Sequence, residues 1–144
     1  FNDLVKFFKR RIPGDQVTTE QLRHRSWWTG PEVWVLVDDY DLVATSSGTN
    51  PLLPLQPLMA QARDIGLHIL VVRRMGGASQ ASFEPVLKTM GELGATGILL
   101  SGSPDEGTII GRVRPVRSAP GRAQVVSRDL GLVMAQLAWT PPQS

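Results

Sequence analysis

The amino-acid sequence predicts an α/β protein, and three features point to that class. Short apolar runs rich in β-branched residues alternate with segments whose apolar residues recur at helical spacing. Their order is strand, helix, strand, helix, strand, which is typical of right-handed crossovers that place helices on both faces of a mostly parallel sheet. The 144 residues suffice for one domain with its own core, and the chain has no cysteine for a disulfide or a thiol nucleophile.

Two short helices are expected in the first thirty residues. A face of apolar residues predicts the first helix, which ends before Pro13; these residues are Phe1, Leu4, Val5 and Phe8. Thr18 and Gln21 have the spacing of a capping box, so a second helix is expected from there through Leu22. The adjacent pair Trp27–Trp28 follows. One of these side chains is expected either to be exposed and bind a partner or to hold this loop on the core.

The first two strands are expected on either side of a crossover helix. Val33–Val37 is apolar at every position, which predicts a buried parallel strand. Residues 49–57 contain three prolines, so this stretch can begin a helix but cannot be its middle. The apolar spacing of Leu55–Ala62, with Gly66 in the place of a left-handed cap, predicts the crossover helix. Leu67–Val72 is then the second strand.

The second half of the chain predicts one more helix and a β extension. Apolar residues in Phe83–Leu93 repeat the helical spacing before Gly94, and Gly97–Leu100 starts a third strand. Short β-like pieces punctuated by glycine and proline follow Gly107, and they predict an antiparallel or mixed extension of the sheet. These pieces are Thr108–Ile110, Gln124–Val126 and Leu132–Trp139. Residues 140–144 are expected to form an exposed tail.

Charge and hydropathy narrow the range of partners. The net charge is +2, and no apolar run approaches the length of about 20 residues that a membrane-spanning helix needs. Five arginines occur with no acidic residue between Glu106 and Asp129, namely Arg112, Arg114, Arg117, Arg122 and Arg128. Such a stretch fits nucleic-acid phosphates, an acidic protein or a solvated loop. Because no aromatic residues are interleaved for stacking on bases, we do not expect nucleic-acid binding.

The pair Asp38–Asp39 is the candidate catalytic site, because it directly follows the strand Val33–Val37. The carboxyl ends of parallel strands form the ligand-binding edge of an open α/β sheet. At that edge Asp38 can hold a magnesium ion and Asp39 can orient an attacking water, which is the Walker B arrangement. The Asp39 side chain is shorter than the glutamate that is common at the second position of this motif, so a degenerate site is one alternative. The alternative is that Asp39 or Asp41 caps a helix starting near Tyr40.

The pair Arg73–Arg74 is the candidate phosphate contact. It follows the second strand directly, from where a guanidinium can reach a phosphate; a solvated strand end is the alternative. The spacing of a phosphate-binding P-loop is absent, since the sequence contains no Gly-Lys pair. We therefore expect that this chain alone does not hydrolyse ATP.

Several segments together resemble a known family. They are Arg25–Glu32, Val37–Val43, Gln61–His68, Leu100–Gly102, Asp105–Gly107 and Pro120–Arg122. The combination is similar to the C-terminal ATPase domain of EccC, the FtsK/SpoIIIE-like motor of mycobacterial and actinobacterial type VII (ESX) secretion systems. The resemblance runs from about Thr18 to Pro142.

The resemblance implies a RecA-like fold of the ASCE P-loop NTPase group, of which residues 1–144 are one partial FtsK-like domain. The Walker A loop and the first strand are then expected before Phe1, and without them a strand edge and apolar helix faces are exposed. The resemblance implies ATP and Mg²⁺ as ligands of the complete domain. It places Asp38–Asp39 and Arg73–Arg74 at the nucleotide, with Asp38 at the metal.

The resemblance also implies a biological setting. The parent protein is expected to be a membrane-anchored motor on the cytoplasmic face of the plasma membrane, in a hexameric ring with other EccC ATPase domains and subunits. Its substrates are small helical WXG-motif (EsxB-like) proteins, whose ATP-dependent export it drives or regulates. A DNA-translocating FtsK-type motor and an interaction module with no remaining nucleotide role are the alternatives.

Overall fold

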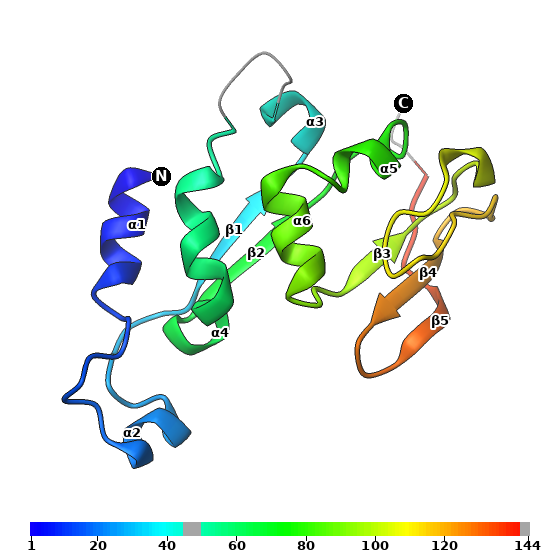
Figure 1. The fold of residues 1–144 in the computed structure, drawn as a ribbon. Coiled ribbons are helices and arrows are strands. Elements are labelled where there is room, and N and C mark those ends of the chain that lie inside the picture. The colour runs from blue at the N-terminus through cyan, green and yellow to red at the C-terminus, as the bar shows by residue number, and fades with distance from the viewer. Residues whose placement is uncertain (45–49, 142–144) are drawn as a thin grey trace. The chain divides into compact units, whose positions relative to one another are not determined.

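The contacts divide the protein into two units. The structure is a computed structural model, and it describes residues 1–44 and 50–141. The first unit is Phe1–Arg73 and the second is Arg74–Ser144 (Figure 1). None of the helices in the described ranges is long and apolar enough to cross a membrane.

A pair of parallel strands forms the sheet of the first unit, as predicted. β1 (Val33–Val37) and β2 (Leu67–Val71) pair over all five residues of each strand. The pairing extends beyond them, because the Val72 N–H donates to the carbonyl of Val37 at 2.8 Å and the Tyr40 N–H donates to the carbonyl of Val72 at 2.9 Å. The carboxyl ends of the two strands are therefore held side by side.

The crossover between these strands differs from the predicted α-helix. It consists of the 3₁₀-helix η1 (Leu53–Gln61) and the short helix α4 (Ala62–Ile65). Pro54 and Pro57 lack a main-chain N–H, so this stretch forms 3₁₀ turns where the apolar spacing alone favours an α-helix. Gly66 ends α4 with a φ of +71°, which confirms the predicted left-handed cap. Thr49, where the prediction for this segment begins, lies outside the described residues.

The two N-terminal helices are confirmed. α1 (Asn2–Lys9) is followed by α2 (Thr19–His24), which begins with the predicted capping box. The Thr18 Oγ1 accepts from the Gln21 N–H at 3.2 Å, and the Gln21 Oε1 accepts from the Thr18 N–H at 2.9 Å. Both bonds satisfy main-chain donors that a helix start leaves free.

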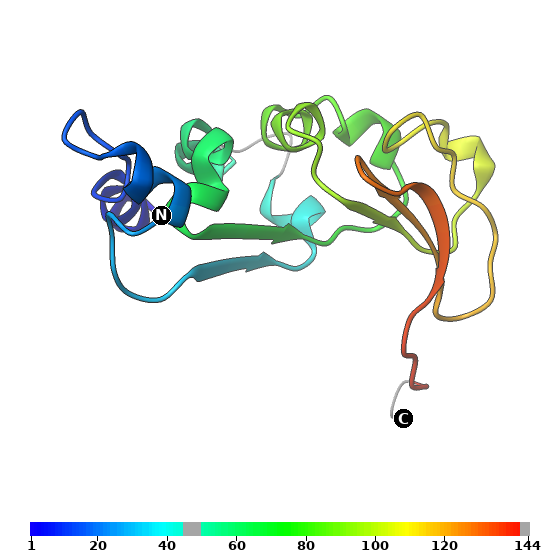
Figure 2. The same cartoon turned by 90° about the horizontal axis from the view of Figure 1, so that it is seen from below.

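The core of the first unit lies between its helices and one face of its sheet. η1 and α4 lie on one side of β1 and β2 (Figure 2). The buried cluster joins α1, the crossover and β2; its members are Phe8, Leu55, Leu58, Ile65 and Leu67. Val33, Val35 and Ile69 point to it from the sheet. Alternate residues of the strands therefore bury one face of the sheet.

The opposite face of this sheet is apolar but exposed. Trp34 and Leu36 of β1 are 62% and 67% exposed, and Leu70 of β2 is 49% exposed. The prediction of a fully buried strand is therefore wrong for one face of β1. Helices of this unit cover the sheet on one side, whereas the strand sequence is apolar on both sides. The Trp34 ring stacks on the ring of His68, with 4.3 Å between the centroids.

A buried arginine joins α1 to the loop before β1. Arg11 is 5% exposed, and its guanidinium donates to the carbonyls of Ile65 at 3.1 Å and Pro31 at 3.0 Å. Its guanidinium carbon lies 4.0 Å from a Trp28 ring centroid, and burial lowers the pKa of the guanidinium from its ordinary value. The Trp27 indole donates to the Arg11 carbonyl at 2.7 Å. Of the two roles considered for the adjacent tryptophans, the structure therefore supports the structural anchor.

The second unit carries the predicted β extension. Its strands are β3 (Gly97–Leu99), β4 (Arg122–Ser127) and β5 (Gly131–Gln136), and its helices are α5 (Ala78–Ala81), α6 (Pro85–Glu92) and η2 (Pro104–Glu106). The three strands form an antiparallel sheet in the order β3-β4-β5. Of the predicted piece Thr108–Ile110, only the bridge between Ile110 and Val113 is regular.

The third strand differs from its prediction. We expected β3 to continue the parallel sheet, but among the described strands it pairs only with β4, and antiparallel. Periodicity predicts a strand without naming its partner, because pairing depends on which strand lies beside it in space. α6 begins at Pro85, whose fixed φ suits a first helical turn, so Phe83 precedes the helix and is 78% exposed. The predicted tail, residues 140–144, lies outside the described ranges from residue 142 onward.

Candidate nucleotide site at the carboxyl end of the parallel strands

The two predicted acids lie where the parallel strands end. Asp38 and Asp39 follow β1 directly, and both are exposed. Arg73 lies two residues after the end of β2, and β2 pairs with β1 in register. The bonds of Val72 to Val37 and Tyr40 hold the two chain segments together at this point. Asp38, Asp39 and Arg73 thus share one edge of the sheet, as the sequence predicted.

The carboxylate of Asp39 is not used as a helix cap. Asp39 stands before α3 (Tyr40–Val43), but its side chain makes no capping bond to that helix. Its main chain is left-handed, with φ +46° and ψ +49°, and its N–H donates to the Asp38 Oδ1 at 2.9 Å. Aspartate is one of the few side chains that tolerate this conformation. Capping by Asp39, the structural alternative to a Walker B role, is therefore not what the fold shows.

A hydrogen bond between a buried tyrosine and an asparagine fixes the chain next to the two acids. Tyr40 is fully buried, and its Oη accepts a hydrogen bond of 2.6 Å from the Asn50 Nδ2. Asn50 Oδ1 accepts from the Leu52 N–H at 2.9 Å, and Leu52 is itself fully buried. The residue next to Asp39 is thereby fixed to the core. Sequence reasoning missed this contact; its only signal was a tyrosine directly after two acids.

The two predicted arginines separate at the boundary between the units. Arg73 is the last residue of the first unit and is half-buried, and Arg74 is the first residue of the second. Both have interaction partners within the chain. Contact of Arg73 or Arg74 with a phosphate stays a prediction.

The donor set at this edge suits magnesium in part. Carboxylate oxygens are preferred ligands of Mg²⁺, which usually binds one or two carboxylates together with substrate phosphates. Asp38 uses Oδ1 for the Asp39 N–H, which leaves Oδ2 available to an ion. Within the described ranges there is no group of three or more acidic, histidine or cysteine side chains that could hold a metal by themselves. The residues therefore fit a Mg²⁺ ion that arrives with a nucleotide.

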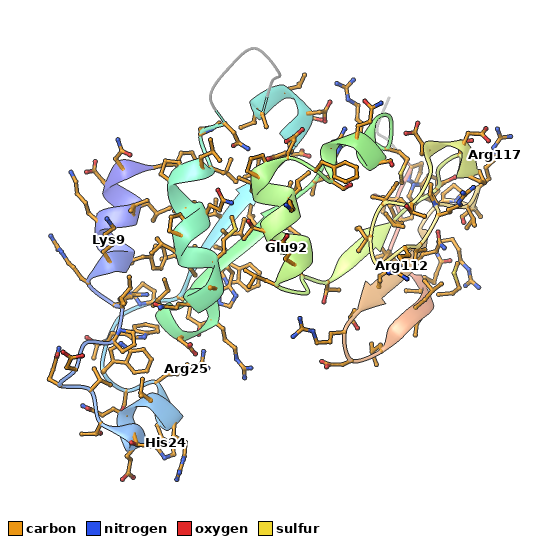
Figure 3. All side chains as sticks on the ribbon, in the orientation of Figure 1. Lys9, His24, Arg25, Glu92, Arg112 and Arg117 are labelled. Carbon is orange, nitrogen blue, oxygen red and sulfur yellow. The ribbon has the colours of Figure 1, made fainter. Side chains whose placement is uncertain are left out.

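The predicted stretch of arginines lies in the second unit. Arg112 and Arg117 are exposed, and Figure 3 labels both. Arg128 donates to the Leu93 carbonyl at 3.4 Å, so it belongs to the fold of this unit. For Arg112, Arg114 and Arg117 the described part of the chain provides no ion pair. The alternative of a solvated loop therefore agrees with the structure.

The fold and its acidic edge indicate a class of protein. An apolar parallel strand that ends in two exposed acids, with a helical crossover to the next strand, is consistent with the fold of a P-loop ATPase domain. No family model matches the chain.

The chain is similar to EccC proteins along nearly its whole length. It is 49% identical over 141 residues to "ESX-4 secretion system protein EccC4" of Mycobacterium tuberculosis, which covers 98% of this chain and 11% of that protein. It is 45% identical over 137 residues to "ESX secretion system protein EccC" of Thermomonospora curvata, covering 95% of this chain and 10% of that protein. The chain thus spans about a tenth of the length of each of these two relatives.

Solved structures agree with these sequence relatives. The cytoplasmic domain of the T. curvata type VII secretion ATPase EccC matches with a TM-score of 0.89 at 44% identity, over 98% of this chain and 16% of that one. T. curvata EccC "(ATPases 2 and 3) in complex with a signal sequence peptide" matches equally well, with 25% of that chain covered. The chain is therefore a homologue of the EccC proteins of ESX secretion systems, with the fold of their ATPase domains.

Proposed function

We propose that this chain is the C-terminal ATPase domain segment of an EccC-type secretion motor, which recognises WXG-motif (EsxB-like) substrates and drives or regulates their ATP-dependent export. One observation carries the nucleotide part. The Asp38 and Asp39 carboxylates are exposed at the carboxyl edge of the parallel strands, and α3 does not use Asp39 as a cap. The relative solved with a signal sequence peptide supports the substrate part.

In this proposal Asp38 holds Mg²⁺ through its free carboxylate oxygen, and Asp39 orients the attacking water if the site is active. When bound, ATP would supply the phosphoryl group, and Mg²⁺ would neutralise the negative charge of its phosphates. Arg73 and Arg74 contact phosphate. The phosphate loop comes from a preceding segment of the parent protein, so residues 1–144 alone do not hydrolyse ATP.

The setting of the parent protein is part of the same proposal. The motor is anchored in the plasma membrane with this domain on the cytoplasmic face, and its ATPase domains assemble into a ring with other subunits. The kinship with secretion-system proteins supports this arrangement. Membrane attachment then belongs to other segments of the parent.

The test uses the longer parent protein, which includes the segment expected to hold the phosphate loop. Mg²⁺-ATP binding is titrated for the wild type, for Asp38→Asn and for the matched control Asp64→Asn, an exposed acid away from the strand end. We expect Asp38→Asn to weaken Mg²⁺-dependent binding about tenfold or more, because charge-assisted contacts contribute about 1.5–3 kcal/mol. Unchanged binding in Asp38→Asn would contradict the assignment of Asp38 as the Mg²⁺ ligand, and absence of Mg²⁺-ATP binding in the wild type would favour an interaction module with no nucleotide role.

Substrate recognition is tested by titrating the same protein with a peptide from the C-terminal tail of an EsxB-like protein, with and without Mg²⁺-ATP. Saturable binding in either condition supports substrate docking, and a requirement for nucleotide makes Asp38 and Asp39 part of a switch. Absence of peptide binding, together with DNA binding that falls steeply with salt, would favour the DNA-translocating alternative.

A further inference from the structure

The outer edge of β5 has no strand beside it. In the order β3-β4-β5, β4 pairs with one edge of β5 from Arg122 to Ser127. Within the described part of the chain no other strand pairs with β5. An open edge of this kind presents a row of main-chain donors and acceptors to the surroundings.

The ladder determines which groups of β5 face outward. The Leu137 N–H donates to the Gly121 carbonyl at 2.7 Å, which makes these two residues a hydrogen-bonded pair next to β5. Such pairs alternate along an antiparallel ladder, so odd-numbered residues of β5 bond to β4 and even-numbered ones face outward. The outward residues include Leu132 and Met134. Among the described residues their main-chain groups have no hydrogen-bond partner.

Nothing in the sequence of β5 protects this edge. Natural edge strands are commonly blocked by lysine, proline, a bulge or a covering loop. Gly131–Gln136 contains no charged residue and no proline, and its register with β4 is unbroken. Leu132 is 52% exposed, Met134 49% and Val133 36%, so aliphatic side chains are accessible on both faces of the strand. At the far end the Gln136 Nε2 donates to the carbonyls of Leu137 at 3.2 Å and Pro120 at 3.4 Å, on the side of β4, so it does not cover the outer edge.

We propose that β5 binds an extended segment of a partner polypeptide as an added strand. The unpaired N–H and C=O groups recognise a main chain, which specifies an extended peptide. Exposed aliphatic residues on both faces select β-branched or aliphatic neighbours, because cross-strand side-chain pairs stabilise a sheet. The lack of charge on β5 selects an uncharged segment without proline. Its length is about six residues, or about 20 Å, to match the strand.

This interaction goes beyond the proposed nucleotide and substrate roles and does not depend on them. β5 belongs to the second unit, whereas Asp38 and Asp39 belong to the first. An added strand forms main-chain bonds, and these do not require a nucleotide. Failure of either proposal therefore leaves the other standing.

The probe is a synthetic peptide, Lys-Val-Thr-Val-Ile-Thr-Val-Lys, whose terminal lysines provide solubility. Its binding to the full chain is measured by fluorescence anisotropy, and amide hydrogen exchange by NMR locates the contact. We expect saturable binding and exchange about tenfold slower at Leu132 and Met134, since these N–H groups become paired. The control peptide carries N-methyl groups at alternate residues, which remove the donors facing the edge.

The decisive variant is Met134→Pro. Its missing N–H faces outward, so the bonds between β5 and β4 stay intact while the open edge loses a donor and gains a blocking ring. We expect the dissociation constant to rise about tenfold or more, and Met134→Ala to change it less than about threefold. Circular dichroism of both variants checks that the fold is retained.

Three results would overturn the proposal. One is the absence of saturable peptide binding to the wild type. Another is equal binding by Met134→Pro or by the N-methylated peptide, which would place the contact elsewhere. The last is a concentration-dependent dimer of the wild type that Met134→Pro dissociates, since the edge would then be occupied by a second copy of this chain.

Discussion

The side-chain amide of Asn50 donates a 2.6 Å hydrogen bond to the phenolic oxygen of the fully buried Tyr40. Tyr40 directly follows the two candidate acids in the sequence. Removing the hydroxyl in Tyr40→Phe should lower the free energy of unfolding by about 1 kcal/mol, the usual contribution of one hydrogen bond. Asn50→Ala should cost about 2 kcal/mol, because the Leu52 N–H loses its acceptor as well. Urea denaturation measures both values.

The double variant tests whether these two residues act through each other. Because part of the loss in Tyr40→Phe comes from this bond, that loss should be smaller in the Asn50→Ala background than in the wild type. Fully additive losses would show that the two side chains contribute independently.

Two substitutions of Asp39 separate the effect of its left-handed main-chain conformation from the effect of its charge. Asp39→Val should lower the free energy of unfolding by about 1–2 kcal/mol, because a β-branched residue is strained at a φ of +46°. Asp39→Asn should change it by less than about 0.5 kcal/mol, since asparagine tolerates this conformation. Thermal unfolding compares the two variants. Equal stability of Asp39→Val and Asp39→Asn would mean that the turn relaxes.

Arg11 is predicted to stabilise the first unit through its guanidinium. Arg11→Met keeps an apolar stem but loses the bonds to Ile65 and Pro31, so the free energy of unfolding should fall by about 2–3 kcal/mol. Arg10→Met, at the neighbouring exposed position, is the control and should stay within about 0.5 kcal/mol.

The effect of Arg11→Met should also be independent of pH. Burial lowers the pKa of this guanidinium from its ordinary value, so its contribution to folding changes only when the pH approaches that lowered pKa. Arginine keeps its proton in proteins near neutral pH. Equal losses are therefore expected from about pH 5 to 8, and a loss that varies across this range would contradict the assignment.

Two glycines make a matched pair with opposite predictions. A Cβ at Gly66 would lie 2.7 Å from the Trp28 Cη2, at a φ of +71°, so Gly66→Ala should destabilise the first unit by about 3 kcal/mol. Gly91 lies in α6 with nothing within 4 Å of such an atom. Gly91→Ala should therefore stabilise the second unit by about 0.5–1 kcal/mol, because alanine favours a helix. Hydrogen exchange reports each unit separately.

The uncovered sheet face should govern the solubility of the isolated chain. Leu36→Thr removes apolar surface that is 67% exposed, so light scattering should show less aggregation while the free energy of unfolding changes little. Leu58→Thr is the control in the buried core and should cost more than about 2 kcal/mol. Unchanged aggregation in Leu36→Thr would mean that this face does not mediate self-association.

Local signals in the sequence predicted much of this protein. The Thr18–Gln21 capping box, the cap at Gly66 and the strand that ends in Asp38 could all be read directly, because each depends on a few adjacent residues. The EccC resemblance rests on motifs of the same kind. These signals specify dihedral angles and periodicity, which the chain determines locally.

Only the tertiary structure decided which of these signals is used, and how. It left Trp34 exposed on an apolar strand, paired β3 antiparallel with β4, and joined Tyr40 to Asn50 and Arg11 to Trp28. Each of these outcomes depends on which segments, distant in sequence, lie side by side. Periodicity shows that a residue can be buried or paired, but only packing supplies the neighbour that buries or pairs it.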